Sequence, residues 1–373
     1  MRYGGKSAII PPSPIHHIYK DVCNADSYKK FPKSHIALVW KEADCDPYLI
    51  AKAAEDAGAA ALILYNPPEA KYLSNARVRI VEWTEGDRLI QIPVLSMTHS
   101  VGVALASMKD ATISVATNTS LEVLETFNVL CDTKRGDPHN VIVVGAHLDG
   151  VPAGPGIVDN GSGSATLLEV AIQFYRSRRI RKIENKIRFA WWGAEEVGLL
   201  GSRHYVRSLK EGDHKDRRDL QRIAANLNYD MLASPNGRVG IHDGKTAPAN
   251  VQASSSQITH ALSSYFNTTF PKSHHALAPM YAGSDFLPFL NAGIPSGGLD
   301  SGAGGIKTAE ERRLYGGIAG APYDGCYHKD CDTVENVDID LLRIMGKVAA
   351  YGVETLAEMK NIRDWLDIHI RRR

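Results

Sequence analysis

Acidic residues and histidines follow several apolar segments of this 373-residue chain, and their chemical types suit metal binding. His147 comes just after residues 141–145, a β-branched run typical of a buried strand. Asp159 lies beyond a loop rich in glycine and proline, whose backbone can turn tightly enough to bring the carboxylate beside the imidazole. Because imidazoles and carboxylates are zinc ligands, this spacing predicts part of a metal site.

A pair of adjacent acids, Glu195 and Glu196, follows the next strand-like segment, residues 186–192. Neighbouring side chains at a strand end point in different directions, so one glutamate can bind metal while the other faces a substrate. A Glu-Glu pair alone is usually a solvated surface pair. Its position after a segment with two tryptophans and before a glycine-rich turn favours a functional role.

Two more candidates occur later in the chain. Asp230 ends the strand-like residues 223–230, and His328 lies between Cys326 and Cys331, where a disulfide could hold the loop rigid. A single histidine after a strand is more often a hydrogen-bonded core residue than a ligand. Together, however, the candidates form a set large enough for two metal ions: His147, Asp159, Glu196, Asp230 and His328.

The elements that must position these side chains alternate in type. Residues 123–130 and 141–145 are expected to be strands separated by a polar turn, and residues 161–175 a helix that begins at the Asp159 loop. Residues 337–365 have an apolar face at helical spacing and are expected to be mainly helical. Strands that alternate with helices predict an α/β fold.

Composition limits the possible partners. The chain has 43 Lys+Arg and 42 Asp+Glu residues, so its charge predicts neither a nucleic acid nor an anionic membrane as partner. Its longest strongly apolar run, residues 57–65, is too short to span a bilayer. The length allows two domains and a large core.

The cysteines favour an oxidising compartment. Cys326 and Cys331 form a close pair, and Cys23 and Cys45 are a second candidate pair. The first residues lack the apolar core of a secretory signal, so we expect the targeting segment to be missing from this chain. Three triplets could accept N-glycans, and the last of them lies in the proposed metal loop, where we expect no modification: Asn118, Asn267 and Asn160.

The first 120 residues carry no cluster of candidate catalytic groups. Residues 35–40, 59–65 and 92–96 are typical of strands, and residues 49–57 and 101–108 of helices. The simplest interpretation is a scaffold or a substrate-access domain.

The sequences of residues 36–40, Asp44-Cys45 and residues 51–66 resemble the protease-associated (PA) domain, a small β-rich module inserted into several peptidases. The resemblance implies a Cys23–Cys45 disulfide and a module that shapes or covers a substrate cleft. We therefore expect a PA domain over residues 1–120, with an incomplete lead-in, and a catalytic domain over residues 121–373.

Three motifs of the second part resemble the co-catalytic zinc aminopeptidases. They are residues 147–164, residues 189–202 and the Cys326-Tyr-His-x-x-Cys-Asp sequence. This family includes secreted bacterial and fungal leucine-type enzymes and the vacuolar aminopeptidase Y type, which carries a PA insert. The resemblance covers about residues 123–360 and implies the zinc exopeptidase fold, a mixed central sheet flanked by helices, and a secreted or vacuolar location.

The same resemblance implies two zinc ions per chain. His147, Asp159 and Asp230 would bind one, and Asp159, Glu196 and His328 would bind the other, with Asp159 as the bridging carboxylate. Glycine-rich residues 297–308 resemble the wall of the substrate pocket, although a plain flexible connection is an equal alternative.

Catalytic roles follow from the same motifs. Glu195 matches the general base and Tyr327 a donor to the oxyanion, while Asp149 is placed to accept the other N–H of the His147 imidazole. The expected substrate is a peptide with a free amino terminus and an apolar first residue, and the expected state is a monomer.

Two departures and three alternatives remain. Gly283 stands where bacterial relatives of this family often carry an arginine. Relatives with the PA insert usually have peptidase sequence and a secretion signal before the insert. Because this chain begins almost at the insert, we expect it to be a fragment or a truncated gene product. The alternatives are a carboxypeptidase or dipeptidase with the same metals, a one-zinc glutaminyl cyclase, and an inactive homologue.

Overall fold

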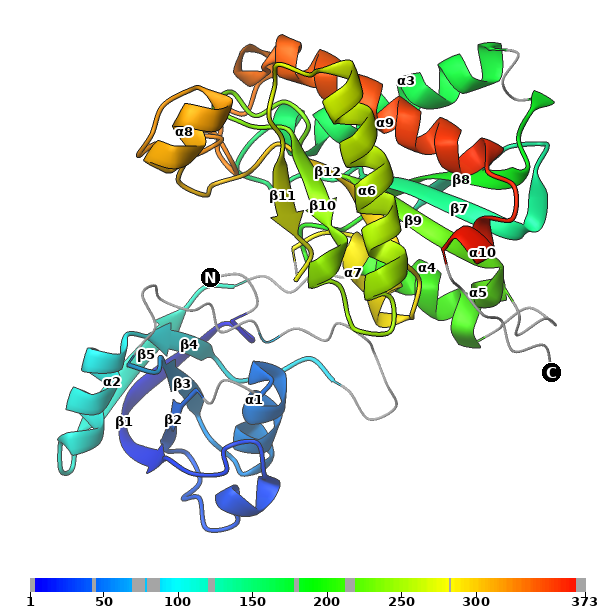
Figure 1. Cartoon of the computed structure of the whole chain (residues 1–373). Coiled ribbons are helices and arrows are strands. Elements are labelled where there is room, and N and C mark those ends of the chain that lie inside the picture. The colour runs from blue at the N-terminus through cyan, green and yellow to red at the C-terminus, as the bar shows by residue number, and fades with distance from the viewer. Residues whose placement is uncertain are drawn as a thin grey trace. The chain divides into compact units, whose positions relative to one another are not determined.

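The computed structural model describes residues 4–41, 45–68, 78, 88–119, 125–177, 181–211, 219–281 and 283–366. The chain divides into two compact units, Met1–Glu125 and Thr126–Arg373 (Figure 1). The division lies close to the boundary expected after residue 120. None of the described helices is long and apolar enough to cross a membrane.

The first unit is built on a five-stranded sheet with the order β4-β3-β2-β1-β5. Strands β1 to β4 run parallel to their neighbours, and β5 is antiparallel to β1. The strands are β1 (Ala8–Ile18), β2 (Ile36–Trp40), β3 (Ala61–Tyr65), β4 (Val94–Met97) and β5 (Thr112–Thr117). Helices α1 (Pro47–Asp56) and α2 (His99–Ser107) and the short turn η1 (Ala25–Tyr28) complete it. Cys23 and Cys45 form a disulfide, as the resemblance implied.

The second unit contains a seven-stranded mixed sheet with the order β11-β10-β12-β9-β7-β8-β6. Its central strands β8, β7, β9 and β12 are parallel, while β6 and β10 are antiparallel to β8 and β12. The strands are β6 (Val129–Asp132), β7 (Asp137–His147), β8 (Asn185–Trp192), β9 (Ile223–Tyr229), β10 (Gly240–Asp243), β11 (Ala276–Pro279) and β12 (Ser296–Asp300). This is the expected α/β architecture.

Helices cover both faces of this sheet, as Figure 1 shows. Ile142 and Val144 of β7 pack into the core shared with α3, α6 and α9, and the alternate residues Val141 and Val143 pack into the core on the α4, α5 and α7 side. Both faces of β7 are buried, which explains its continuous apolar sequence. The helices are α3 (Gly163–Arg176), α4 (Leu200–Glu211), α5 (Asp219–Arg222), α6 (Gln252–Thr269), α7 (Phe286–Asn291), α8 (Ala309–Tyr315), α9 (Ile339–Glu358) and α10 (Ile362–Trp365).

Several predicted bounds were wrong. The strand expected over residues 123–130 is limited, among the described residues, to β6, whose residues are all exposed, and residues 121–124 lie outside the described part. Strand β7 continues beyond Gly145 to His147. Residues 337–365 are mainly helical, as expected, with an interruption between α9 and α10, where Asn361 has a left-handed backbone conformation (φ 52°).

Candidate metal centre

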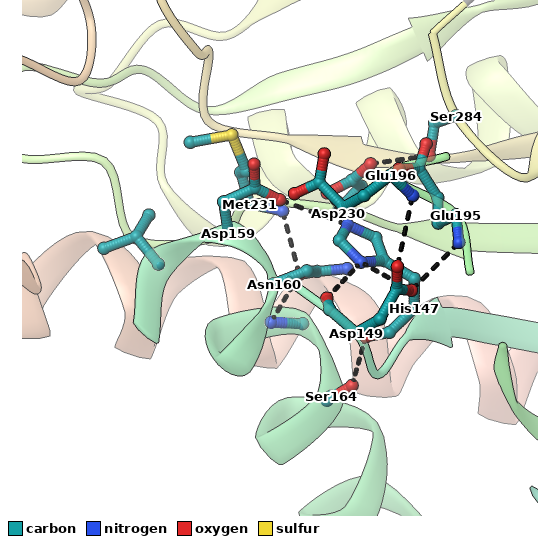
Figure 2. Close-up of polar contacts among 12 residues, drawn as sticks. His147, Asp149, Asp159, Asn160, Ser164, Glu195, Glu196, Asp230, Met231 and Ser284 are labelled. Atoms are coloured by element: carbon teal, nitrogen blue, oxygen red, sulfur yellow. Dashed lines mark hydrogen bonds and ion pairs between the residues drawn. The ribbon is translucent and has the colours of Figure 1, made fainter. Parts of the chain in front are cut away.

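Three parallel strands bring their carboxyl ends to one edge of the sheet. Strand β7 ends at His147, β9 is followed directly by Asp230, and β8 leads into the turn that carries Glu195 and Glu196. Because β7 pairs with both β8 and β9 in parallel, these side chains meet at the same edge, where open α/β sheets bind their ligands (Figure 2).

The loop after β7 returns Asp159 to this edge. Residues Ile157–Ser162 form a short irregular helical turn before α3. Asn160 fixes this turn because its side-chain oxygen accepts the amides of Gly163 (2.9 Å) and Met231 (3.0 Å), and its side-chain nitrogen donates to the carbonyl of Tyr229 (2.9 Å). Asn160 is buried, so its triplet is not accessible for glycosylation.

Five side chains form two overlapping groups of three ligand atoms. In the first, His147 Nε2 lies 3.1 Å from Asp159 Oδ1 and 3.2 Å from Asp230 Oδ1. In the second, His328 Nε2 lies 3.1 Å from both Asp159 Oδ2 and Glu196 Oε2. The two oxygens of Asp159 therefore face different groups. The structure thus brings together the same residues that the sequence motifs implied for each of the two zinc sites.

The geometry of both groups suits a divalent cation. Tetrahedral zinc with bonds of ~2.0–2.2 Å holds neighbouring ligand atoms ~3.3 Å apart, close to the separations found here. Oε1 of Glu196 is buried and has no hydrogen-bond partner among the described residues, while Oε2 of the same carboxylate lies 3.1 Å from His328 Nε2. A cation between the ligand atoms would satisfy groups that the protein's own hydrogen bonds do not.

The electrostatics of the site also favour a cation. Burial raises the pKa of Asp159, but hydrogen bonds from His147 and His328 outweigh it and lower the pKa to about 2. Burial lowers the pKa of His147, but Asp230 and Asp159 raise it well above its usual value. The carboxylates thus favour a positive charge beside them, which protonated imidazoles supply in the absence of metal. A bound metal ion would supply the same charge.

Asp149 acts differently from the prediction. His147 Nδ1 is 2.9 Å from the backbone carbonyl of Asp149 and 3.8 Å from its carboxylate, so the carbonyl and not the carboxylate accepts the imidazole N–H. The carboxylate instead accepts the amides of Glu195 (2.9 Å) and Glu196 (3.3 Å), as Figure 2 shows. Asp149 therefore fixes both the ring orientation of His147 and the turn that carries the two glutamates.

A chain of hydrogen bonds that the sequence did not predict holds Asp230. The hydroxyl of Ser284 donates to Asp230 Oδ2 at 2.6 Å, and Asn228 Nδ2 donates to the Ser284 hydroxyl at 2.7 Å. Ser284 lies two residues before α7, far from Asp230 in sequence, so no local pattern pointed to it. With Oδ2 held in this way, Asp230 Oδ1 faces His147 (Figure 2).

Glu195 and Tyr327 line the same cavity of about 260 Å³ as the ligand groups. Burial, followed by the charge of Asp230, raises the pKa of Glu195 to about 9. A divalent cation nearby would act in the opposite direction. The Tyr327 ring stacks on His328 with 3.8 Å between ring centroids, and burial with the surrounding carboxylates raises the pKa of its hydroxyl.

The loop around His328 is closed by a Cys326–Cys331 disulfide, as predicted. Gly283, the first of the two expected departures, has a left-handed backbone conformation (φ 103°) and also lines the cavity. The remaining walls come from β10, β11, β12, the start of α7 and the loop after β12. The glycine-rich loop contributes Gly302 and Ala303, in agreement with a role as a pocket wall.

Comparison with known proteins relates this arrangement to peptidases. An aminopeptidase of Pseudomonas aeruginosa is 39% identical over 340 residues, which cover 90% of this chain and 60% of the relative. Leucine aminopeptidase 2 of Trichophyton rubrum is 36% identical over 343 residues, covering 90% of this chain and 64% of the relative. The chain therefore spans less than two thirds of the length of these relatives.

The solved structure of a zinc aminopeptidase from Bacillus subtilis shares the fold. Its TM-score is 0.55 at 24% sequence identity, and the similarity covers 96% of this chain and 77% of that one. Residues 13–105 match the PA domain, and residues 128–353, more than half of the chain, match peptidase family M28. The chain that brings these two groups of ligands together therefore belongs to peptidase family M28 and carries a PA domain.

Proposed function

We propose that this protein is an aminopeptidase that binds two zinc ions per chain and removes an apolar first residue from peptides. The observation that carries the proposal is the pair of ligand groups joined by Asp159, with Glu195 in the same cavity. The aminopeptidases of Pseudomonas aeruginosa and Trichophyton rubrum, and the zinc aminopeptidase of Bacillus subtilis that shares the fold, support the same activity.

The zinc ions would be held as the two groups suggest. His147, Asp159 and Asp230 form one site, and Asp159, Glu196 and His328 form the other. When bound, such ions lower the pKa of a water molecule from ~15.7 towards ~7 and act as Lewis acids. The protein's own contribution is to fix the ligands through Asn160, Asp149 and Ser284.

Glu195 is the proposed general base. Its backbone amide is held by Asp149, so its carboxylate reaches the cavity from a fixed turn. In the reaction Glu195 takes a proton from the attacking water and then gives that proton to the nitrogen of the leaving amine. The proton count balances because one water is split between the new carboxylate and the released amine.

Tyr327 is the proposed donor to the oxyanion. Stacking on His328 and the Cys326–Cys331 disulfide hold its ring beside the ligand groups. A tyrosine hydroxyl, with an ordinary pKa of about 10, is protonated at neutral pH, so it can donate as negative charge develops on the carbonyl oxygen. Loss of one such donor typically lowers kcat by about 10²–10³-fold.

Exopeptidase specificity follows from the acidic end of the cavity. A free α-amino group is positively charged, and carboxylates of the site line the cavity in which it would lie: Asp159, Glu195, Glu196 and Asp230. Met231, Phe286 and Pro279 contribute apolar surface to the same cavity, which favours an apolar first side chain.

The compartment and assembly state are part of the proposal. Disulfides Cys23–Cys45 and Cys326–Cys331 suit an oxidising, extracytoplasmic environment, either secreted or vacuolar. The PA domain would control access of substrate peptides, and the protein would act as a monomer without nucleic-acid or membrane partners.

The test combines metal analysis with a pair of substrates. We expect two zinc ions per chain, hydrolysis of leucine-p-nitroanilide and no hydrolysis of its N-acetyl form. Glu195→Ala should lower kcat by at least ~10²-fold while retaining zinc, since Glu195 is not a ligand. The matched control Glu335→Ala, at an exposed position of Val334–Asn336, should behave as wild type.

Other results would redirect the assignment. Cleavage of blocked peptides alone would support a carboxypeptidase. A single zinc with cyclisation of amino-terminal glutamine would support a glutaminyl cyclase. Two zinc ions without any hydrolysis would contradict the proposed activity.

A further inference from the structure

A carboxyl group and a hydroxyl form a buried pair beside the metal centre. Asp285 directly follows Ser284, whose hydroxyl donates to Asp230 Oδ2. Asp285 is 1% exposed, and the fully buried Ser202 donates its hydroxyl to Asp285 Oδ1 at 2.5 Å. We propose that Ser202 and Asp285 are positioning residues for metal binding. They hold Ser284 in place, and through its hydroxyl they hold the carboxylate of Asp230 where a zinc ion would bind. This inference rests on the proposed two-zinc function and names two further residues on which metal binding depends.

Asp285 does not have the role that its place in the chain suggests. An aspartate directly before a helix usually accepts an amide hydrogen bond from the first helical turn. Asp285 comes directly before α7, but its side chain makes no such capping bond. Its second oxygen, Oδ2, is buried and has no hydrogen-bond partner among the described residues. Burying a carboxyl group with so few partners costs free energy, so helix capping and packing do not explain an acid here.

Ser202 belongs to a part of the chain that other contacts hold firmly. It lies in the first turn of α4, soon after the turn that follows β8. The carbonyl of the preceding residue, Gly201, accepts a hydrogen bond from Asn128 Nδ2 at 2.9 Å. The Ser202 hydroxyl lies 3.2 Å from the carbonyl of Leu199, so the carboxylate of Asp285 is the nearer acceptor. Ser202 therefore offers its proton to Asp285 from a fixed position.

The segment before α7 has open space on one side. Gly283 has a left-handed backbone conformation, and a Cβ atom placed on it would meet no atom within 4 Å beyond its own chain neighbours. Little therefore restrains Ser284 from the Gly283 side. The restraint that Asp285 provides on the other side matters more, because it ties this segment to the start of α4.

The path from this pair leads to one ligand group. The hydroxyl of Ser284 donates to Asp230 Oδ2 at 2.6 Å, and Asp230 Oδ1 lies 3.2 Å from His147 Nε2 (Figure 2). Asp230 belongs to the first ligand group and not to the second. Loss of the hydrogen bond between Ser202 and Asp285 should therefore loosen the first group and leave the second as it is.

Apolar contacts keep α7 attached to α4 without this hydrogen bond. The ring of Phe289 on α7 lies 5.9 Å from the ring of Trp192 and 6.0 Å from the ring of Tyr205 on α4, measured between centroids. All three side chains are buried in one core cluster. Variants that lack the bond between Ser202 and Asp285 should therefore fold, so a change in their zinc binding reports on positioning.

The experiment measures the two zinc affinities of the full chain by competition with a chelator. Ser202→Ala removes the donor, and Asp285→Ala removes the acceptor. Each should lower the affinity for one zinc ion by about 10–100-fold, the usual effect of changes behind metal ligands, and leave the affinity for the other unchanged. Asp285→Asn removes the charge but keeps a carbonyl oxygen that can accept the hydroxyl, so it should bind zinc as wild type does.

Ser208→Ala is the matched control. Ser208 also lies on α4, and its hydroxyl donates to the carbonyl of Tyr205 in the same helix at 2.8 Å. This variant should keep both zinc affinities. Circular dichroism checks that each variant is folded.

A double variant separates positioning from a general loss of stability. Ser284→Ala breaks the same path nearer to Asp230 and should lower the affinity for the same zinc ion. Adding Ser202→Ala to it should cause little further loss, because both changes act on Asp230 through one path. Two independent effects would instead add.

The outcomes separate this inference from the proposed function. A wild-type chain that binds fewer than two zinc ions would overturn the proposed function. Two zinc ions in wild type, with unchanged affinities in both Ser202→Ala and Asp285→Ala, would overturn the inference alone. An equal loss of both ions, additive effects in the double variant, or an Asp285→Asn variant as weak as Asp285→Ala would also overturn it. If Asp285→Ala does not fold, Ser202→Ala and its double variant with Ser284→Ala decide.

Discussion

The carboxylate of Asp332 accepts a hydrogen bond from the backbone amide of Asp159 at 3.1 Å. It also accepts the amide of Val158 at 2.9 Å, and Asp332 itself is buried. Asp159 is the residue that both ligand groups share. Asp332 thus holds the backbone of Asp159, the shared residue, in place. Asp332 itself belongs to the segment directly after the disulfide loop that carries His328.

We therefore expect Asp332→Asn to weaken zinc binding. An asparagine can present its NH₂ group to one of the two amides, so one acceptor is lost and Asp159 is less well held. Changes behind metal ligands typically lower metal affinity or activity by about 10–100-fold. Competition with a chelator would measure the zinc affinity. Asp330→Asn, at an exposed position of the same loop, is the control, and equal affinity in both variants would contradict the role of Asp332.

The two disulfides should differ in what they support. The Cys326–Cys331 bond constrains the loop that carries Tyr327 and His328, whereas Cys23–Cys45 lies in the first unit. Replacing Cys326 and Cys331 by serine should lower stability by about 2 kcal/mol and also reduce zinc content.

The corresponding double serine variant of Cys23 and Cys45 serves as its control. This variant should lower the free energy of unfolding by about 3 kcal/mol, because the Cys23–Cys45 bond closes a longer loop. It should still bind two zinc ions. Differential scanning calorimetry and metal analysis measure the two effects. Normal zinc content in the Cys326/Cys331 variant would show that the loop holds His328 without the disulfide.

Removal of metal should destabilise one unit selectively. All members of both ligand groups belong to Thr126–Arg373. A ligand present at 100 times its Kd stabilises the folded state by about 2.7 kcal/mol, so a chelator should lower the Tm of this unit by several degrees. The transition of Met1–Glu125 should not move. Equal shifts of both transitions in calorimetry, or no shift at all, would count against metal binding at these residues.

His242 should make stability depend on pH. Burial lowers its pKa below 6.5 in the folded protein, so the unfolded chain binds the extra proton first as the pH falls. The stabilisation is thus fully present above about pH 6.5 and is lost as the pH falls below that value. The difference in unfolding free energy between wild type and His242→Gln should therefore shrink from about pH 7.5 to about pH 5.

The same comparison with His260→Gln controls for a histidine in general. His260 is exposed on α6, so its replacement should not change the pH dependence. Urea unfolding of all three proteins at both pH values supplies the measurement. A constant difference between wild type and His242→Gln would mean that His242 takes up a proton equally well in both states.

The sequence predicted the elements that carry the strongest patterns. Strand β7 was expected from its continuously apolar run, which is typical of a strand buried on both faces, and β8 and β9 were expected from segments rich in apolar residues. The side chains after these three strands were expected to form a metal site. Strand β1 was missed because Pro11, Pro12 and Pro14 interrupt its pattern. It tolerates them in part through an irregular register with β5 between Ile10 and Ser13.

Contacts between distant segments account for most of what was missed at the site. The candidate metal ligands were assigned through family motifs, but nothing in a motif indicates that Ser284 reaches Asp230 or that Asp332 reaches Asp159. Asp149 was recognised as a partner of His147, yet the choice between its carbonyl and its carboxylate depends on the turn after β7. Spacing along the chain does not determine such choices, because they depend on how separate strands align.

The order of the ligands along the chain also has a consequence for synthesis. The first group is complete once Asp230 has left the ribosome, whereas the second group needs His328. Domains form from the amino-terminal side during translation, at ~5–20 residues per second. All residues of the first group are thus made seconds before His328, but both groups lie in one unit and domains generally fold as units, so a nascent chain cannot hold both groups until His328 has been made.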